Sequence, residues 1–149
     1  MTTQEQERQE FTALIQANSH AMFRAARAIL DGDAAAEDAV GEAVLLAWQS
    51  FGRLRRRESA RAWLLNIAAN CAYGQRRREH TTAPLEAAAG AAGPVREELG
   101  LWELVQTLPE DQRLAVTLYY YDGLSVGEIA QVLGAPQGTI KSRLSRARD

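Results

Sequence analysis

Four polar side chains that could contact a nucleic acid recur at helical spacing in SARAWLLNIAANCAYGQRRREH. Asn66, Asn70, Tyr73 and Arg77 follow one another at steps of four, three and four residues, so a helix would align them on one side. Asn is a poor helix former, and two Asn residues on one stripe therefore need an explanation. Amides that bond base edges, a ring that stacks on an unpaired base and an Arg that holds phosphate would together bind single-stranded nucleic acid. We call these four residues the single-strand strip. A solvated surface that merely tolerates Asn is the alternative.

Basic side chains concentrate at two places in the chain. GRLRRRES, just before the strip, puts Arg53, Arg55, Arg56 and Arg57 on a loop that could grip an entering strand. The other place is GTIKSRLSRAR, where small residues beside basic ones would allow close approach to a DNA groove and contacts to bases and phosphates. The residues expected to contact DNA on this last helix are Gly138, Thr139, Lys141, Ser142, Ser145 and Arg146.

Three carboxylates, Glu37, Asp38 and Glu42, form a predicted acidic face, with Asp38 and Glu42 one helical turn apart. Paired carboxylates could bind a metal or act as acid and base, but no cationic group, His or Gly-rich phosphate loop accompanies them. We interpret this face as a docking surface for a protein partner, with a solvated face as the alternative.

Metal, cofactor and disulfide chemistry find no support in the sequence. His20 and His80 have no second His or Cys at ligand spacing, and the single Cys71 cannot form an intrachain disulfide. The N-terminus is polar and acidic, and no apolar run is long enough to span a bilayer. We therefore expect a cytoplasmic protein without membrane insertion, metal or cofactor.

The net charge of −2 is strongly segmented along the chain. Residues 1–51 carry −5, residues 52–80 carry +6, residues 81–135 carry −6 and residues 136–149 carry +3. The two basic segments are separated by an acidic one, which predicts that a polyanion would be bound at two places.

We predict that helices position all of these groups. The sequence is rich in Ala and Leu, and it lacks the alternation of apolar and polar residues that is typical of strands. Residues 10–30 should form the first two helices and residues 34–51 a third, with Val40, Val44, Ala47 and Trp48 as its apolar stripe. A fourth helix, residues 59–80, carries the strip on one side and Trp63, Leu64, Ile67 and Cys71 on its core side.

The C-terminal part predicts a helix-turn-helix. Pro109 is typical of the start of a helix, and Asp122-Gly123 is typical of its end. Ser125 and Glu128 have the spacing of a capping box at the start of the next helix. Gly134-Ala135-Pro136 would turn the chain before the basic helix. The Pro- and Gly-containing residues 81–97 predict a linker between a domain of residues 1–80 and a domain of residues 98–149.

Three segments resemble successive signature segments of the extracytoplasmic-function (ECF) sigma factors, the small two-domain initiation factors of bacterial RNA polymerase. They are DAAAEDAVGEAVLLAW, RAWLLNIAANCAYGQRRR and LPEDQRLAVTLYYYDGLSVGEIAQVLGAPQGTIKSRLSRAR, and the likeness runs from about residue 10 to residue 149. It implies that the acidic face binds the clamp helices of core polymerase and that the last helix reads the minus-thirty-five element. The basic loop and the strip would open the minus-ten element and hold the unpaired non-template strand.

The resemblance also implies an anti-sigma factor as a partner and leaves catalysis to the polymerase. Three alternatives are a sigma-like mimic that binds an anti-sigma factor without DNA, an ordinary repressor or activator, and an enzyme. The intact basic helix disfavours the mimic, and the strip is unexplained in a repressor. No nucleophile with a base, phosphate loop or metal cluster supports an enzyme.

Overall fold

The computed structural model describes residues 3–54, 60–82 and 101–148, with side chains omitted at residues 80–82 and 101. These residues form helices and turns without a strand, which confirms the all-α prediction. The N-terminal helices are α1 (Thr3–Ile29), α2 (Asp33–Phe51) and α3 (Ala60–Thr82), and all three pack on one another. The C-terminal elements are α5 (Leu101–Gln106), α6 (Glu110–Val116), the π-helical turn η2 (Thr117–Tyr121), α7 (Val126–Leu133) and α8 (Gln137–Arg148).

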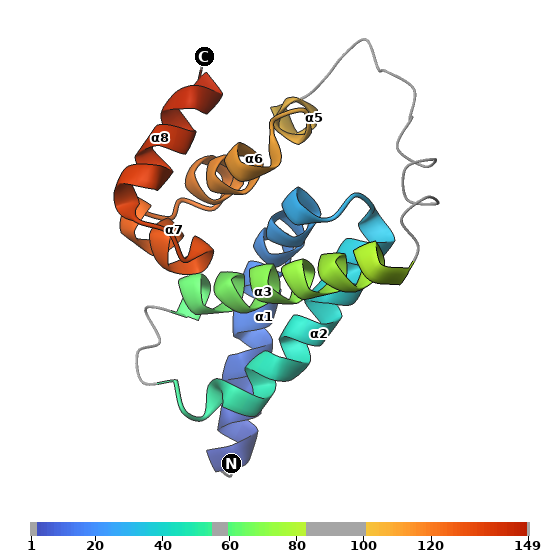
Figure 1. The fold of residues 1–149 in the computed structure, drawn as a ribbon. Coiled ribbons are helices and arrows are strands. Elements are labelled where there is room, and N and C mark those ends of the chain that lie inside the picture. The colour runs from blue at the N-terminus through green and yellow to red at the C-terminus, as the bar shows by residue number, and fades with distance from the viewer. Residues whose placement is uncertain (1–2, 55–59, 83–100, 149) are drawn as a thin grey trace.

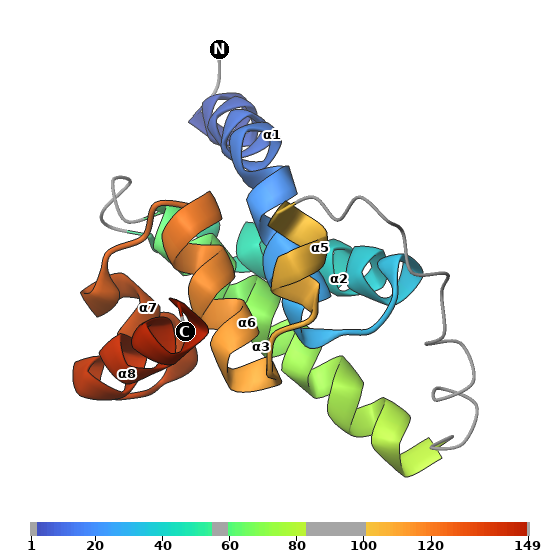
Figure 2. The same cartoon turned by 90° about the horizontal axis from the view of Figure 1, so that it is seen from above.

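The two groups of helices lie against each other, with α7 beside the start of α3 and the two chain ends on opposite sides (Figure 1). Helix α6 and η2 contact α1, and the view from above shows α6 crossing over the N-terminal helices (Figure 2). Most of the predicted linker, residues 83–97, lies outside the described residues.

Alanines line the contacts among α1, α2 and α3. Ala36, Ala39, Ala43 and Ala47 recur at steps of three and four along α2, and none of them has exposed surface. Fully buried alanines of α1 and α3 complete the seam: Ala25, Ala26, Ala28, Ala68, Ala69 and Ala72. Short side chains let helix axes approach closely, since the distance between packed helices depends on the residues at the contact.

The buried stripe of α2 is therefore shifted from the predicted one. Val40 and Val44 are only half-buried, and Trp48 is 38% exposed, so its placement in the core was wrong. The closest contact runs along the alanines, and the bulkier residues lie beside it. Phe51, 1% exposed, ends the stripe in a cluster of aromatic rings.

The first two predicted helices are a single helix, α1, which runs for 27 residues without a Gly or Pro. Asn18 lies between the two expected segments, and a polar residue there could have marked a break. It is buried instead, and its amide donates a hydrogen bond of 2.8 Å to the Leu14 carbonyl one turn back. The helix continues because this amide is satisfied within it.

The predicted helix-turn-helix is confirmed in α7 and α8. The Glu128 backbone N–H donates to the Ser125 hydroxyl at 3.1 Å, and the Ser125 backbone N–H donates to the Glu128 carboxylate at 2.9 Å, completing the capping box. Gly134 ends α7 with φ of 64°, a left-handed conformation that favours glycine. Ile129 and Ile140 then pack the two helices together with no exposed surface.

Pro109 caps the start of α6, as predicted, but the helix changes to the π-helical turn η2 before Asp122. Thr117 is fully buried, and its hydroxyl donates to the Arg113 carbonyl at 2.8 Å. A Thr side chain that bonds the preceding turn competes with the regular helix ladder, which accounts for the local change. Asp122 follows this turn, and its buried carboxylate pairs with Arg24 of α1 at 2.5 Å.

Candidate nucleic-acid interface

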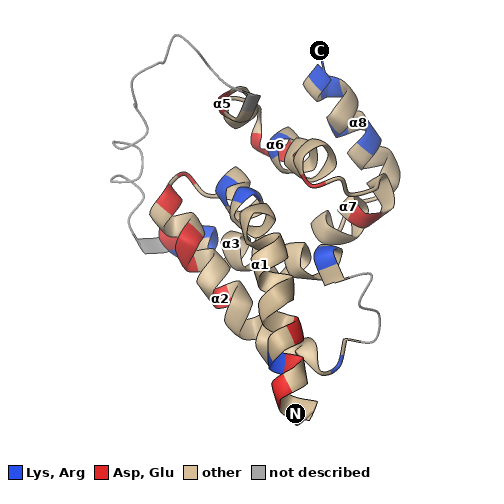
Figure 3. Cartoon of the chain, turned by 180° about the vertical axis from the view of Figure 1, so that it is seen from behind, with Lys and Arg blue, Asp and Glu red and all other residues tan. Residues whose placement is uncertain are grey.

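Helix α8 presents its small and basic side chains outward. Ile140 and Leu144 anchor it in the core, and basic residues recur along the length of the helix (Figure 3). Of the predicted contact residues, Thr139 is half-buried and the others are exposed: Gly138, Lys141, Ser142, Ser145 and Arg146. Four of them line one shallow depression, namely Lys141, Ser142, Ser145 and Arg146. Charged and hydroxyl groups thus share one exposed surface, as contacts in a DNA groove require.

The single-strand strip lies along α3, but its members differ in exposure. Asn70 and Arg77 are exposed, whereas Asn66 and Tyr73 are half-buried. The Asn70 amide donates to the Asn66 side-chain oxygen at 3.2 Å, which aligns the two amides one turn apart. Burial raises the pKa of Tyr73, while Arg76, Arg143 and Arg113 act in the opposite direction. The Arg76 guanidinium lies 5.1 Å from the centre of the Tyr73 ring.

The basic loop before α3 is only partly described. Arg53 is exposed at the end of α2, whereas Arg55, Arg56 and Arg57 lie outside the described residues. Their proposed contact with an entering strand stays a prediction.

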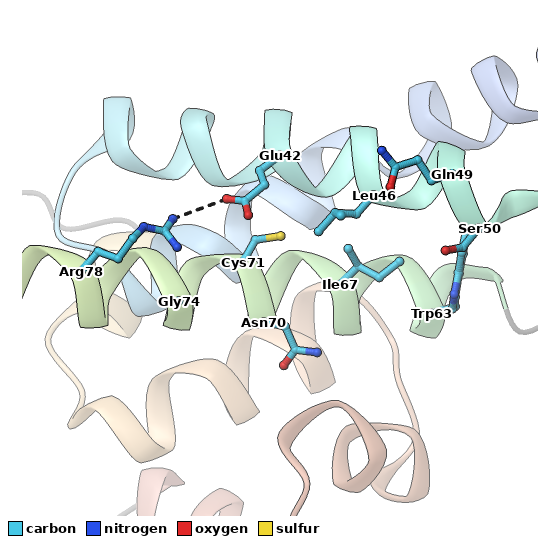
Figure 4. A pocket seen from close by; sticks show the side chains of 10 residues that line it. All are labelled: Glu42, Leu46, Gln49, Ser50, Trp63, Ile67, Asn70, Cys71, Gly74 and Arg78. Atoms are coloured by element: carbon cyan, nitrogen blue, oxygen red, sulfur yellow. Dashed lines mark ion pairs between the residues drawn. The ribbon is translucent and has the colours of Figure 1, made fainter.

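The acidic face lies on the exposed side of α2, where Glu37, Asp38 and Glu42 are all exposed. Glu42 reaches across to α3 and pairs with Arg78 at 3.6 Å. A groove of about 380 Å³ begins at this pair and runs between side chains of the two helices (Figure 4). Leu46 lines it from α2, and Ile67 and Cys71 line it from α3.

Three large apolar side chains next to the acidic face were not predicted as part of it. Leu45 is 66% exposed, Leu46 is 42% exposed and Trp48 is 38% exposed. Leu45 and Leu46 follow Glu42 by three and four residues and so share its side of α2. The available signal was the run VLLAW, which contains more consecutive apolar residues than one helix face can bury. Exposed apolar groups beside carboxylates are typical of a protein-binding surface.

Cys71 lines this groove, and the reactivity of its thiol at different pH values tests how the groove affects it. Burial, together with the negative charge of Glu42, raises the pKa of its thiol from 9.0 to about 11, with Arg78 opposing. A raised pKa keeps the thiol protonated and unreactive below that pH, because only the thiolate attacks. We expect Ellman's reagent to react ~100-fold more slowly near pH 8 than with the urea-unfolded chain, the rate rising about tenfold per pH unit. Equal rates for the folded and unfolded chain at pH 8 would contradict this prediction.

Within residues 3–54, 60–82 and 101–148, no group of three or more His, Cys, Asp or Glu residues is arranged to hold a metal ion. No described helix combines the length and the apolar character needed to cross a bilayer.

Two family models match separate parts of the chain. Residues 14–82 match the family description "Sigma-70 region 2", and residues 99–149 match "Sigma-70, region 4". The ECF RNA polymerase sigma factor SigM of Mycobacterium tuberculosis is 32% identical over 147 residues, which cover 95% of this chain and 75% of SigM. The ECF RNA polymerase sigma-E factor of Escherichia coli K12 is 31% identical over 132 residues, covering 75% of this chain and 69% of that protein.

Two solved structures have the same fold. The sigma factor RpoE in complex with the anti-sigma factor NepR from Bartonella quintana superposes with a TM-score of 0.72 at 29% identity, covering 95% of this chain and 91% of RpoE. CnrH, in complex with the cytosolic domain of CnrY, superposes with a TM-score of 0.65 at 26% identity, covering 95% and 84% of the two chains. The chain therefore belongs to the ECF sigma factors of the sigma-70 family, non-enzymatic initiation factors that direct RNA polymerase to promoters.

Proposed function

We propose that this sigma factor divides promoter recognition between residues 98–149, which read the minus-thirty-five element, and residues 1–80, which open the minus-ten element. In this proposal the outer side of α8 contacts duplex DNA, and the single-strand strip holds the unpaired non-template strand. Arg55, Arg56 and Arg57 guide the strand toward the strip.

The observation that carries the proposal is the contrast between the two sides of α8. Ile140 and Leu144 are buried, while Lys141, Ser142 and Arg146 are exposed around a single depression. A helix anchored by apolar residues on one side and basic with small residues on the other suits the major groove.

Docking to the clamp helices of core polymerase is assigned to α2. Glu37, Asp38 and Glu42 provide charge, and we add Leu45 and Leu46 as the apolar part of the same surface. Apolar contacts supply most of the affinity of such surfaces, while charges favour the correct partner and orientation.

We further propose an anti-sigma factor as a regulatory partner and the cytoplasm as the location. Two similar sigma factors, RpoE and CnrH, were solved in complex with NepR and with CnrY. A protein that works with polymerase on DNA must share their compartment.

Run-off transcription with core polymerase on genomic fragments tests the proposal. The chain with core polymerase should give discrete transcripts, and the chain alone should bind duplex DNA only weakly. Tight, sequence-specific binding by the isolated chain as a dimer would instead favour a repressor.

Two substitutions on α8 should separate base reading from phosphate contact. Arg146→Ala should cost ~1–3 kcal/mol against the preferred minus-thirty-five sequence and relax discrimination there, because this exposed Arg lies near the centre of the outer side. Lys141→Ala should weaken binding to all sequences about equally and reduce the salt slope by about one unit. Holoenzyme affinity for promoter and scrambled elements across a salt series measures both. An equal loss on the two DNAs for both variants would refute base reading by Arg146.

A further inference from the structure

Gln137, the first residue of α8, is not among the residues that the sequence predicts to contact DNA. It is exposed, and its side chain extends back to the start of α7, where Gly127 leaves space for it. A Cβ at position 127 would lie 3.4 Å from Nε2 of Gln137, so the amide lies close to the backbone of Gly127. The two residues line one open depression together with Ser125 and Gln131. One side chain therefore connects the starts of both helices of the helix-turn-helix.

The hydrogen-bonding groups of the Gln137 amide are available to a partner outside the chain. The polar groups nearest to it are paired with each other, because the Ser125 hydroxyl and the Glu128 carboxylate complete the capping box of α7. Among the described residues, none forms a hydrogen bond with the Gln137 side chain. The amide is thus placed by the contact with Gly127, while its donors and its acceptor stay unused.

The position of Gln137 in the fold is one from which a helix-turn-helix reads bases. The N-terminal residues of the second helix contact base edges, while the first helix crosses the DNA backbone. Gln137 is the first residue of α8, and its amide lies against the start of α7. Gly138 is exposed, and beyond its own helix no described atom lies within 4 Å of where a Cβ would be. DNA can therefore approach this turn of α8 closely.

The chemistry of an amide selects one base in the major groove. The Gln carbonyl accepts from N6 of adenine while the NH₂ group donates to N7, and no other base presents this adjacent donor and acceptor. Arg146 carries donors only and so favours guanine. The two residues are nine positions apart, which is about 13 Å along an α-helix, so they reach different base pairs.

We propose that Gln137 is a specificity residue that reads an adenine of the minus-thirty-five element, and that Gly127 positions it by leaving the space beside its amide. This inference rests on the proposed reading of that element by α8. A bidentate contact needs the amide in one orientation. A long side chain at position 127 would occupy the place of the amide and turn it away from the base, although it would touch no base itself.

Selection from duplex promoter fragments with a randomised minus-thirty-five element tests the proposal. The holoenzyme binds the fragments, and sequencing of the bound ones gives the base preference at each position. Gln137→Ala should lower the preference for adenine at one position from at least about fivefold to nearly none, because a bidentate pair supplies at least that discrimination. The dependence of affinity on salt should stay unchanged, since the lost side chain is uncharged.

Two substitutions of Gly127 test the positioning separately from the contact. Gly127→Leu should lose the same adenine preference with Gln137 intact, because its side chain would displace the amide. Gly127→Ala should keep the preference, since a Cβ at 3.4 Å is close to ordinary contact distance. Gln131→Ala is the matched control, because Gln131 is an exposed Gln that lines the same depression from α7. It should leave the preference at every position unchanged, and circular dichroism should show the same helix content in all variants.

The contact and the proposed function fail in different ways. If Arg146→Ala relaxes one position and Gln137→Ala relaxes none, base reading by Gln137 is refuted and reading by α8 stands. If neither variant relaxes any position, the proposed reading by α8 is itself refuted. A loss in Gln137→Ala that Gly127→Leu does not share supports the contact and refutes positioning by Gly127. A loss at the same position in both variants, absent in Gly127→Ala, supports the whole proposal.

Discussion

Phe51→Ala should lower the free energy of unfolding of the N-terminal helices by about 3–5 kcal/mol, which is the usual cost of truncating a buried aromatic residue. Phe51 is 1% exposed at the end of α2, and its ring centre lies 5.1 Å from that of Phe11 on α1. It also lies 6.5 Å from the ring of Trp63 on α3, so one side chain joins all three helices. Urea unfolding followed by circular dichroism measures the loss.

Leu45→Ala is the stability control for this change. Leu45 lies on the same helix but is 66% exposed, and surface truncations usually change stability by less than about 0.5 kcal/mol. A similar loss for both variants would contradict the aromatic cluster as the anchor of α2. Because Phe51 precedes the basic loop, the variant should also lose promoter-dependent transcription at temperatures where its N-terminal helices unfold.

Asn70→Ala combined with Tyr73→Ala should strongly reduce the open complex while leaving polymerase binding and the closed complex nearly intact. Stacking is worth ~1–3 kcal/mol per base, and the lost amide removes a base-edge partner. The open complex should therefore fall by roughly tenfold or more, since 1.4 kcal/mol corresponds to a factor of ten. Permanganate footprinting of unpaired thymines measures the change.

Tyr73→Phe is the matched control, because it keeps the ring and removes only the hydroxyl. It should retain most of the permanganate reactivity if stacking is the role of Tyr73. Unchanged reactivity in the double Ala variant would exclude the strip from strand contact. Loss of polymerase binding in that variant would show that the strip serves docking or folding instead.

Much of the fold could be predicted from the sequence because the relevant interactions are local. The Ser125 and Glu128 capping box and the turn at Gly134 join residues at most a few positions apart, so residue types and spacing are enough to predict them. The outward side of α8 also followed from the spacing of Ile140 and Leu144. Signature segments in a fixed order then indicated the family, and the similarity to known sigma factors confirmed it.

Other features depend on which helices meet, and spacing alone does not decide that. The apolar residues of α2 could fill more than one stripe, and only contact with α1 and α3 selected Ala39 and Ala43 for burial and left Leu45 and Leu46 exposed. The continuous α1 likewise depends on Asn18, whose side chain bonds both Leu14 and Arg61.

The position of Asp122 shows the same limit most clearly. In the sequence it is an ordinary helix-ending residue before Gly123, with no sign of a partner. Arg24 lies 98 residues away and Arg61 lies 61 residues away, and neither separation follows a helical period. Local propensity determines where helices begin and end, whereas burial of a charge depends on how two groups of helices dock, because only docking removes water from the carboxylate and brings distant guanidinium groups to it.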